Sequence, residues 1–144
     1  MNSEKVIQGR KNRARGLEFE RKVRLDLEND GWIVSKWQNN VSFGLDFVKG
    51  QIEPIVEGIG KCIPAKMGRY RTNQNGFPDF ICYKHKGKDL YKVVFVEVKI
   101  NGYLSKEEKE KAIWYLNNKY CSEFFVASLL NKKINYKKCL SLKN

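Results

Sequence analysis

Two carboxylates and one ammonium, those of Asp79, Glu97 and Lys99, are the groups in this sequence best placed to do chemistry. Glu97 and Lys99 lie near the end of a run rich in β-branched and aromatic residues, 93–100, which predicts a strand. Side chains alternate along a strand, so these two charges share one face, while the opposite face is apolar throughout. A strand that is apolar on both faces is buried. Charges placed on it must be paired, bound to a metal or at the mouth of a cleft.

Asp79 precedes a second predicted strand that begins at Phe80. A turn centred on Lys88 would join the two strands as an antiparallel hairpin and put Asp79 opposite Glu97. Residues opposed in this way have Cβ atoms roughly 4.5–5.5 Å apart. Two like charges at that distance repel each other unless a cation lies between them, and carboxylate oxygens suit Mg²⁺, with Mn²⁺ as a substitute. The same register pairs Tyr83 with Val93 and Ile81 with Phe95.

A Mg²⁺ held by these carboxylates would acidify and orient a water and offset charge in a phosphoryl transition state. Lys99 could stabilise the same charge or help to position the water. A third acid, Glu20, falls on the apolar arc of a helix predicted over 16–29, an arc formed by Leu17, Phe19, Val23 and Leu27. Glu20 could complete the cluster, or it could form an ion pair with Arg24 one turn later.

Each of these residues also has a purely structural interpretation. Asp79 could cap a turn after Pro78. Glu97 and Lys99 could form an ion pair on an edge strand, which contributes little to stability. The apolar opposite face of the strand argues against an edge position.

The composition favours a polyanionic partner. The 144 residues contain 28 Lys plus Arg against 16 Asp plus Glu, a formal charge of +12. Such an excess suits nucleic acid, although it could serve solubility alone. Residues 1–15 lack the apolar segment of a secretory signal, and no apolar run approaches the ~20 residues of a membrane span. We therefore expect an intracellular, cytoplasmic protein with no membrane association.

The cysteines and the single histidine indicate no metal site of their own. The four cysteines form no C-x-x-C pair, which disfavours a structural zinc site, and scattered free cysteines suit a reducing compartment. The sequence leaves open whether Cys121 and Cys139 form a disulfide.

The order of predicted elements indicates one mixed α/β domain spanning 1–144. After the first helix come a strand at 31–38, a poorly patterned insertion at about 39–77, the hairpin, a second helix and two further strands. Ser105 and Glu108 predict a capping box for the second helix. That helix is expected over 106–119 with an apolar stripe of Ala112, Ile113, Leu116 and Tyr120, and the last strands are expected over 123–130 and 134–140.

Two basic segments are candidates for contact with DNA. Residues 1–15, which include Arg13 and Arg15, form either a frayed terminus or an arm lying on phosphates. In the insertion, basic residues interleaved with Tyr70 suit contact with a nucleic-acid backbone, or else a solvated loop. These basic residues are Lys66, Arg69 and Arg71.

At this point the sequence resembles a known superfamily. Pro78-Asp79 followed by Glu97-Val98-Lys99 resembles the PD-(D/E)xK nuclease motif. The segment 16–21 resembles the entry to archaeal Holliday junction resolvases, and Gly102-Tyr103-Leu104-Ser105 resembles virus-type replication-repair nucleases of the same superfamily. The resemblance covers 16–38 and 76–127.

The resemblance implies a restriction-endonuclease-like core with a central mixed β-sheet flanked by helices. It implies that Glu20, Asp79 and Glu97 are metal-linked acids, that Lys99 is the catalytic lysine and that the Val98 carbonyl is a further ligand. It also implies a homodimer that acts on branched or junction DNA, with Ser42 standing for a loop serine of the resolvases.

The sequence therefore predicts a Mg²⁺-dependent DNA endonuclease that is dimeric and selects its substrate by DNA structure. The alternative is a non-catalytic DNA-binding protein that uses the same basic surface. An RNA-binding module is disfavoured because no RNP or KH signature is present.

Overall fold

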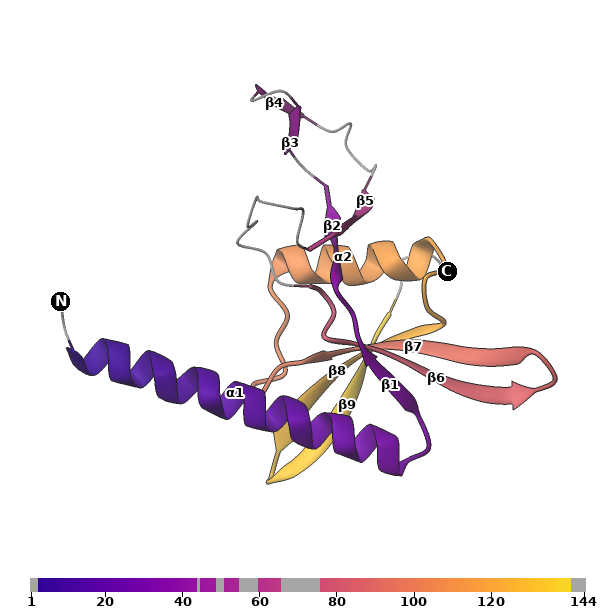
Figure 1. Ribbon diagram of the computed structural model, residues 1–144, viewed down its shortest axis with the longest axis horizontal. Coiled ribbons are helices and arrows are strands. Elements are labelled where there is room, and N and C mark those ends of the chain that lie inside the picture. The colour runs from indigo at the N-terminus through magenta and orange to yellow at the C-terminus, as the bar shows by residue number, and fades with distance from the viewer. Residues whose placement is uncertain (1–2, 44, 49–50, 55–59, 66–75, 141–144) are drawn as a thin grey trace.

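The structure is a computed structural model that describes residues 3–43, 45–48, 51–54, 60–65 and 76–140, with side chains in all but the second and third ranges. Two helices and nine strands are found there (Figure 1). In chain order they are α1 (Ser3–Asn29), β1 (Ile33–Lys36), β2 (Asn39–Ser42), β3 (Leu45–Val48), β4 (Gln51–Pro54), β5 (Lys61–Pro64), β6 (Phe80–Gly87), β7 (Leu90–Val98), α2 (Lys106–Asn117), β8 (Glu123–Leu130) and β9 (Lys133–Cys139).

The main sheet has β7 at its centre, in the order β1-β6-β7-β8-β9. β7 pairs antiparallel with β6 and parallel with β8, so the sheet is mixed. The predicted hairpin register is confirmed: Ile81 lies opposite Phe95, and Tyr83 opposite Val93. The predicted element order is also confirmed, since α1 and β1 precede the hairpin and α2, β8 and β9 follow it.

Both faces of β7 are buried, as its composition predicts. Val94 and Val96 pack against α1 through Phe19, Val23 and Leu27. On the other face, Phe95 packs against Ala112 and Tyr115 of α2. Phe95 also meets Tyr115 edge-on, with ring centroids 4.9 Å apart, an arrangement that aromatic rings favour. The sheet is thus covered by one helix on each face (Figure 1).

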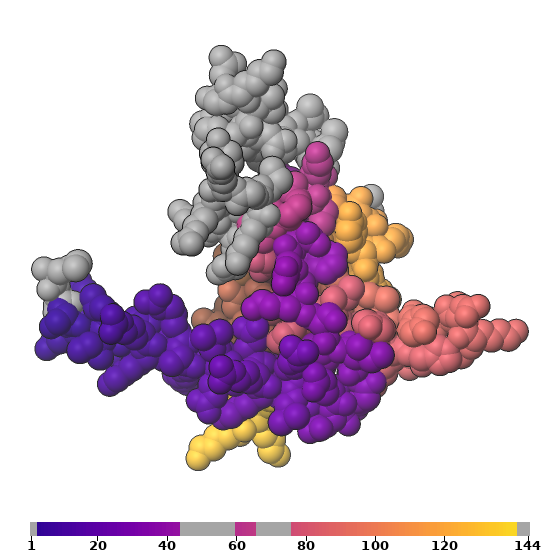
Figure 2. All heavy atoms as spheres, in the orientation of Figure 1, coloured from indigo at the N-terminus to yellow at the C-terminus, as the bar shows by residue number. Residues whose placement is uncertain are grey.

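The first helix is longer than predicted, because α1 begins at Ser3 rather than near residue 16. Only its second half packs on the sheet, and residues 3–15 extend past the body of the molecule (Figures 1 and 2). Extending a helix that is already anchored by packing avoids the cost of a new nucleus. The predicted apolar arc is also too wide, since Leu17 is 55% exposed while Phe19, Val23 and Leu27 are buried.

The insertion contains strands of its own. β2 pairs with β5 and β3 pairs with β4, both antiparallel, as two separate ribbons. The segment 41–48 contains the end of β2 and all of β3, although the insertion shows no clear pattern in the sequence. The basic cluster Lys66, Arg69 and Arg71 lies outside the described residues.

The second helix begins with the predicted capping box. The Ser105 side chain accepts a hydrogen bond from the Glu108 N–H at 3.1 Å, and Glu108 accepts one from the Ser105 N–H at 2.9 Å. The predicted apolar stripe is partly wrong, because Tyr120 is 39% exposed. The buried residues of α2 are Lys111, Ala112 and Tyr115.

All four cysteines are free, so the open question of a Cys121–Cys139 disulfide is answered in the negative. Burial raises the pKa of Cys82 and of Cys121 to about 12, which leaves these thiols protonated and unreactive at neutral pH. Neither helix in the described part of the chain is long and apolar enough to span a bilayer.

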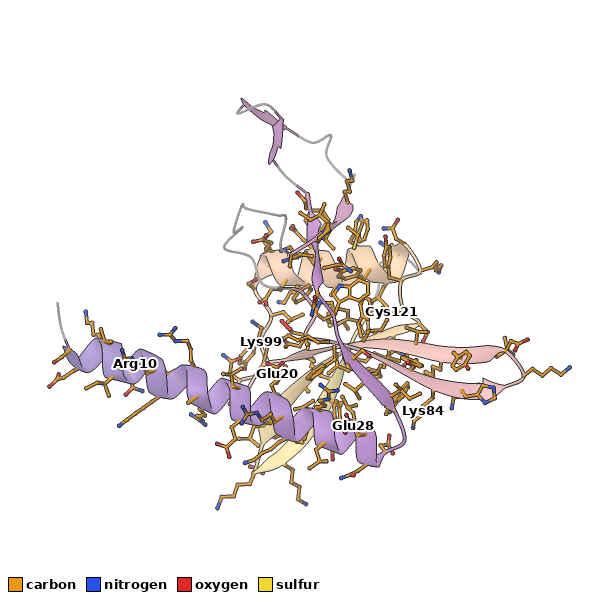
Figure 3. All side chains as sticks on the ribbon, viewed as in Figure 1. Arg10, Glu20, Glu28, Lys84, Lys99 and Cys121 are labelled. Atoms are coloured by element: carbon orange, nitrogen blue, oxygen red, sulfur yellow. The ribbon has the colours of Figure 1, made fainter. Side chains whose placement is uncertain are left out.

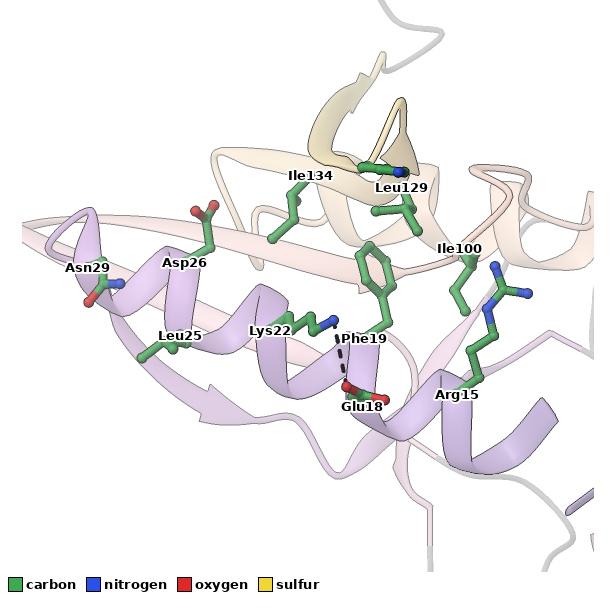
Figure 4. Close-up of a pocket in the computed structure, with 11 residues that line it drawn as sticks. Arg15, Glu18, Phe19, Lys22, Leu25, Asp26, Asn29, Ile100, Leu129 and Ile134 are labelled. Atoms are coloured by element: carbon green, nitrogen blue, oxygen red, sulfur yellow. Dashed lines mark ion pairs between the residues drawn. The ribbon is translucent and has the colours of Figure 1, made fainter. Parts of the chain in front are cut away.

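A hollow of about 520 Å³ separates α1 from the ends of β8 and β9 (Figure 4). Phe19, Ile100, Leu129 and Ile134 give it apolar walls, with Arg15 and Asp26 at its margins. It lies on the Val94 and Val96 face of the sheet, away from the Glu97 carboxyl. It is therefore distinct from the candidate site.

Candidate active site

Asp79 and Glu97 lie at the same end of the β6–β7 hairpin. The ladder pairs Phe80 with Val96, and the next residue on each strand is Asp79 and Glu97 respectively. Asp79 Oδ2 accepts a hydrogen bond from the Val98 N–H at 2.8 Å, which fixes the Asp79 carboxylate against the end of β7. Both residues line a pocket of about 360 Å³. The predicted juxtaposition of these two acids is thus present in the structure.

The Glu97 carboxyl is the more deeply placed of the two, with 5% of the residue exposed. Burial raises its pKa well above the ordinary value, and a hydrogen bond with Asp79 and the charge of Asp79 add to this effect. The positive charge of Lys99 lowers the pKa of Glu97 but offsets only part of this rise. Two carboxyls held together in this way favour a shared proton unless a cation takes its place.

Lys99 is held between two carboxylates. Its Nζ lies 2.7 Å from Glu108 Oε2 and 4.0 Å from Glu97 Oε2. Burial disfavours the charged ammonium, but the hydrogen bond to Glu108 and the charges of Glu97, Glu108 and Asp79 outweigh it and raise the pKa of Lys99. The capping box fixes Glu108 through its other oxygen. The start of α2 therefore sets the position of the Lys99 ammonium.

Glu20 approaches this group from α1, on the edge of the sheet next to β1. Its Oε1 lies 3.8 Å from Lys36 Nζ. Burial raises the pKa of Glu20, and the charge of Asp79 raises it further, so the two carboxylates are close enough to interact. Arg24 pairs with Glu28 at 3.0 Å, so the alternative in which Arg24 pairs with Glu20 is not the one adopted.

No three side chains of the Asp, Glu, His or Cys types converge closely enough to hold a metal by themselves, within the residues that the structure describes. Asp79 and Glu97 do form an adjacent pair. Mg²⁺ commonly binds one or two carboxylates and completes its shell with waters and substrate phosphates. This pair is thus a donor set of the kind that Mg²⁺ uses, and Val98 lines the same pocket, while Glu20 lies outside the pocket lining.

Three further polar residues line the pocket that were not predicted as site residues: Asn40, Glu107 and Lys111. Lys111 is buried, and its Nζ lies 3.2 Å from Glu107 Oε1. The sequence signal that could have found Lys111 is its place one helical turn after Glu108, on the side of α2 that faces the sheet. Asn40 comes from β2, so the base of the insertion contributes to the same pocket.

The predicted DNA-contacting residues are placed unevenly. Arg13 and Arg15 are exposed on α1. Arg15 also lines a hollow of about 350 Å³ together with Asn12, Val98 and Lys99, so α1 passes directly beside the candidate site. Ser42 ends β2 opposite Lys61, and the described residues show no contact from it to Asp79 or Glu97.

Comparison with known proteins adds no relatives. The chain matches no protein-family model, no curated protein and no solved structure. What can be inferred about its function therefore depends on the geometry of the site and on the motif resemblance.

Proposed function

We propose that this protein is a Mg²⁺-dependent DNA endonuclease that hydrolyses phosphodiester bonds, with a restriction-endonuclease-like core and a preference for branched DNA of the Holliday junction type. The observation that carries the proposal is the pair Asp79 and Glu97, joined at the end of one hairpin in one pocket with Lys99. A mixed sheet with a helix on each face is compatible with that core.

Asp79, Glu97 and the Val98 carbonyl would hold the cation, which when bound would neutralise charge on the scissile phosphate and make a water more acidic. The Glu97 carboxyl must lose its proton before it can act as a ligand, and burial makes that loss harder. Lys99, kept charged by Glu108, would face the negative charge that develops on the phosphate. Glu20 remains a predicted member of the metal-linked group through its proximity to Asp79.

The test is a panel of labelled four-way, forked and linear DNA substrates incubated with Mg²⁺, with Mn²⁺ or with EDTA. We expect cleavage that needs the divalent cation and is strongest on the branched substrates. Glu97→Ala and Asp79→Asn should abolish cleavage while leaving DNA binding largely intact. Asp79→Asn is preferred to alanine because its amide oxygen can still accept the Val98 N–H. Undiminished nicking by either variant would refute the assignment.

A second candidate, a non-catalytic DNA-binding protein, is favoured by one specific observation. The Glu97 carboxyl is buried beside Asp79, and this burial raises its pKa and makes the ionised form that a metal needs harder to reach. A binder would retain the charge of +12 and the exposed basic helix without needing a metal. Absence of cation-dependent cleavage on every substrate of the panel, with DNA binding retained, would select this candidate.

We also expect a homodimer, since cutting both strands of a junction requires two sites. Light scattering coupled to size-exclusion chromatography should give twice the mass of the chain. A monomer under conditions where junctions are cut on both strands would contradict this expectation.

A further inference from the structure

Lys111 is a buried lysine in the pocket of the candidate site, and its burial requires a physical explanation. Glu97 and Lys111 are the only charged residues that are buried in the described part of the chain, and both line the same pocket. The Lys111 side chain is 8% exposed and comes from the second turn of α2. Burying an ammonium costs free energy unless a partner compensates for the lost water.

Among the described residues, Glu107 is the carboxylate that pairs with Lys111, and it is poorly placed to compensate for the lost water. The Lys111 Nζ lies 3.2 Å from Glu107 Oε1, and the Glu107 side chain is 67% exposed. The exposed Glu107 carboxylate keeps most of its own hydration, so leaving the pair costs that carboxylate little. The buried ammonium would then lack a partner, so Glu107 can leave only when another anion takes its place.

The other cation of the pocket is already engaged. The Lys99 ammonium lies between Glu108 and Glu97, at 2.7 Å and 4.0 Å. Lys111 thus differs from Lys99 in having a counter-ion that is not itself fixed. The free oxygens of a phosphodiester match a compact ammonium donor, because phosphate and carboxylate both offer anionic oxygens.

We propose that Lys111 forms a second phosphate subsite of this pocket, which binds the backbone phosphate next to the one held near Asp79 and Glu97. Glu107 occupies the subsite in the free protein and leaves it when a nucleic-acid strand enters. This inference rests on the proposed function insofar as DNA is the ligand. The binding step itself needs neither cleavage nor metal.

The test measures DNA binding in EDTA by fluorescence anisotropy over a series of salt concentrations. Lys111→Met keeps the apolar stem and removes the charge. It should weaken binding roughly fivefold and reduce the slope of log K against log salt by about 0.9, the value for one lost phosphate contact on duplex DNA. Glu107→Gln should act in the opposite direction and tighten binding, because it removes the competing carboxylate.

Lys109→Met is the matched control, since Lys109 is exposed on the same helix and its loss changes the net charge equally. If Lys111→Met and Glu107→Gln, both folded by circular dichroism, bind as the control does, the subsite is refuted and Lys111 serves packing alone. If Lys111→Met does not fold, the Glu107→Gln result decides: tighter binding supports the subsite and unchanged binding overturns it.

The two proposals fail separately. A reduced salt slope for Lys111→Met with no cleavage by the wild type would support the phosphate subsite and contradict the proposed nuclease activity. Metal-dependent cleavage by the wild type would support the proposed nuclease activity. If Lys111→Met then matches Lys109→Met in DNA affinity and in salt slope, the phosphate subsite is contradicted.

Discussion

At Glu97, the requirements of the proposed function conflict with the stability of the folded protein. Its carboxyl is buried beside Asp79, and its pKa in the folded state lies above the ordinary value of 4.5. The folded protein therefore holds a proton that the unfolded chain releases, so stability falls as the pH rises through the interval above 4.5. Active sites often carry such destabilising arrangements because function requires them.

We expect Glu97→Gln to raise the free energy of unfolding at pH 7 by on the order of 1 kcal/mol, since it removes a buried charge while keeping the shape. The variant should also lose the fall in stability with rising pH. Urea denaturation at several pH values measures both effects. Glu18→Gln, on an exposed part of α1, is the control and should change little. A destabilised Glu97→Gln variant would show that the carboxylate is compensated in the native state.

Glu108 serves Lys99 and the helix at the same time. One of its oxygens caps the start of α2 and the other pairs with Lys99. Although burial opposes its charge, the hydrogen bonds from Lys99 and Ser105 lower the pKa of Glu108. Its stabilising effect is thus complete above the ordinary glutamate value and is lost as the pH falls through the lowered one.

Glu108→Ala should cost about 1–2 kcal/mol at pH 7, the scale of a lost helix cap with an ion pair, and this cost should shrink at acidic pH. Cleavage, where present, should fall at least tenfold because Lys99 loses its positioning partner. Denaturation and single-turnover assays test the two claims separately. Glu110→Ala, which changes an exposed residue of the same helix, should affect neither.

At the scale of elements, the first half of α1 lies beyond the part of the helix that packs on the sheet. Arg13 and Arg15 are exposed on it, with Arg15 beside Ile100 at the margin of the hollow, and Arg10 lies further out (Figures 3 and 4). Because both side chains are exposed, their replacement should leave the free energy of unfolding within about 0.5 kcal/mol of the wild type.

If the helix lies on DNA, Arg13→Ala and Arg15→Ala should each reduce the salt slope of DNA binding by about 0.9. Anisotropy titrations over a salt series provide the measurement, with Lys133→Ala on β9 as a control of equal charge. Slopes equal to the control would show that this half of α1 is merely solvated.

The sequence predicted the elements that have a clear periodic pattern and missed those that lack one. β8 was expected over 123–130 and is found there, because its apolar residues run between clear boundaries. Residues 3–15 carry no apolar stripe, so periodicity could not reveal that they continue the helix. The apolar stripe predicted for α2 included Tyr120, which is exposed, and did not include Lys111, which is buried.

The part of the candidate site that depends on the strand register of one hairpin could be predicted from the sequence. A hairpin with a fixed turn places Asp79 opposite Glu97 from sequence alone. The contributions of Asn40, Glu107 and Glu108 depend on how α2 and β2 pack against that hairpin, which no local pattern encodes. The exact separation of Glu20 from the other acids is likewise a tertiary property.

At the scale of the whole molecule, a cation bound at Asp79 and Glu97 should stabilise the fold, because it binds the native state alone. We expect Mg²⁺ at about one hundred times its Kd to add about 2.7 kcal/mol to the free energy of unfolding. The effect should weaken as the pH falls, since protons compete for Glu97. Thermal melting with and without Mg²⁺ measures it, and Glu97→Gln should respond less. An equal response in that variant would place the cation elsewhere.

Because α1 projects beyond the sheet, it should determine how far the DNA backbone is protected on each side of a bound protomer. At 1.5 Å per residue, residues 3–15 reach about 20 Å from the point where Arg15 passes Val98 and Lys99 of the candidate site, roughly the span of six stacked base pairs. The footprint of a bound protomer should therefore be lopsided, with protection from hydroxyl radicals running further on one flank of the nick. Deleting residues 1–12 should make that footprint even on both sides.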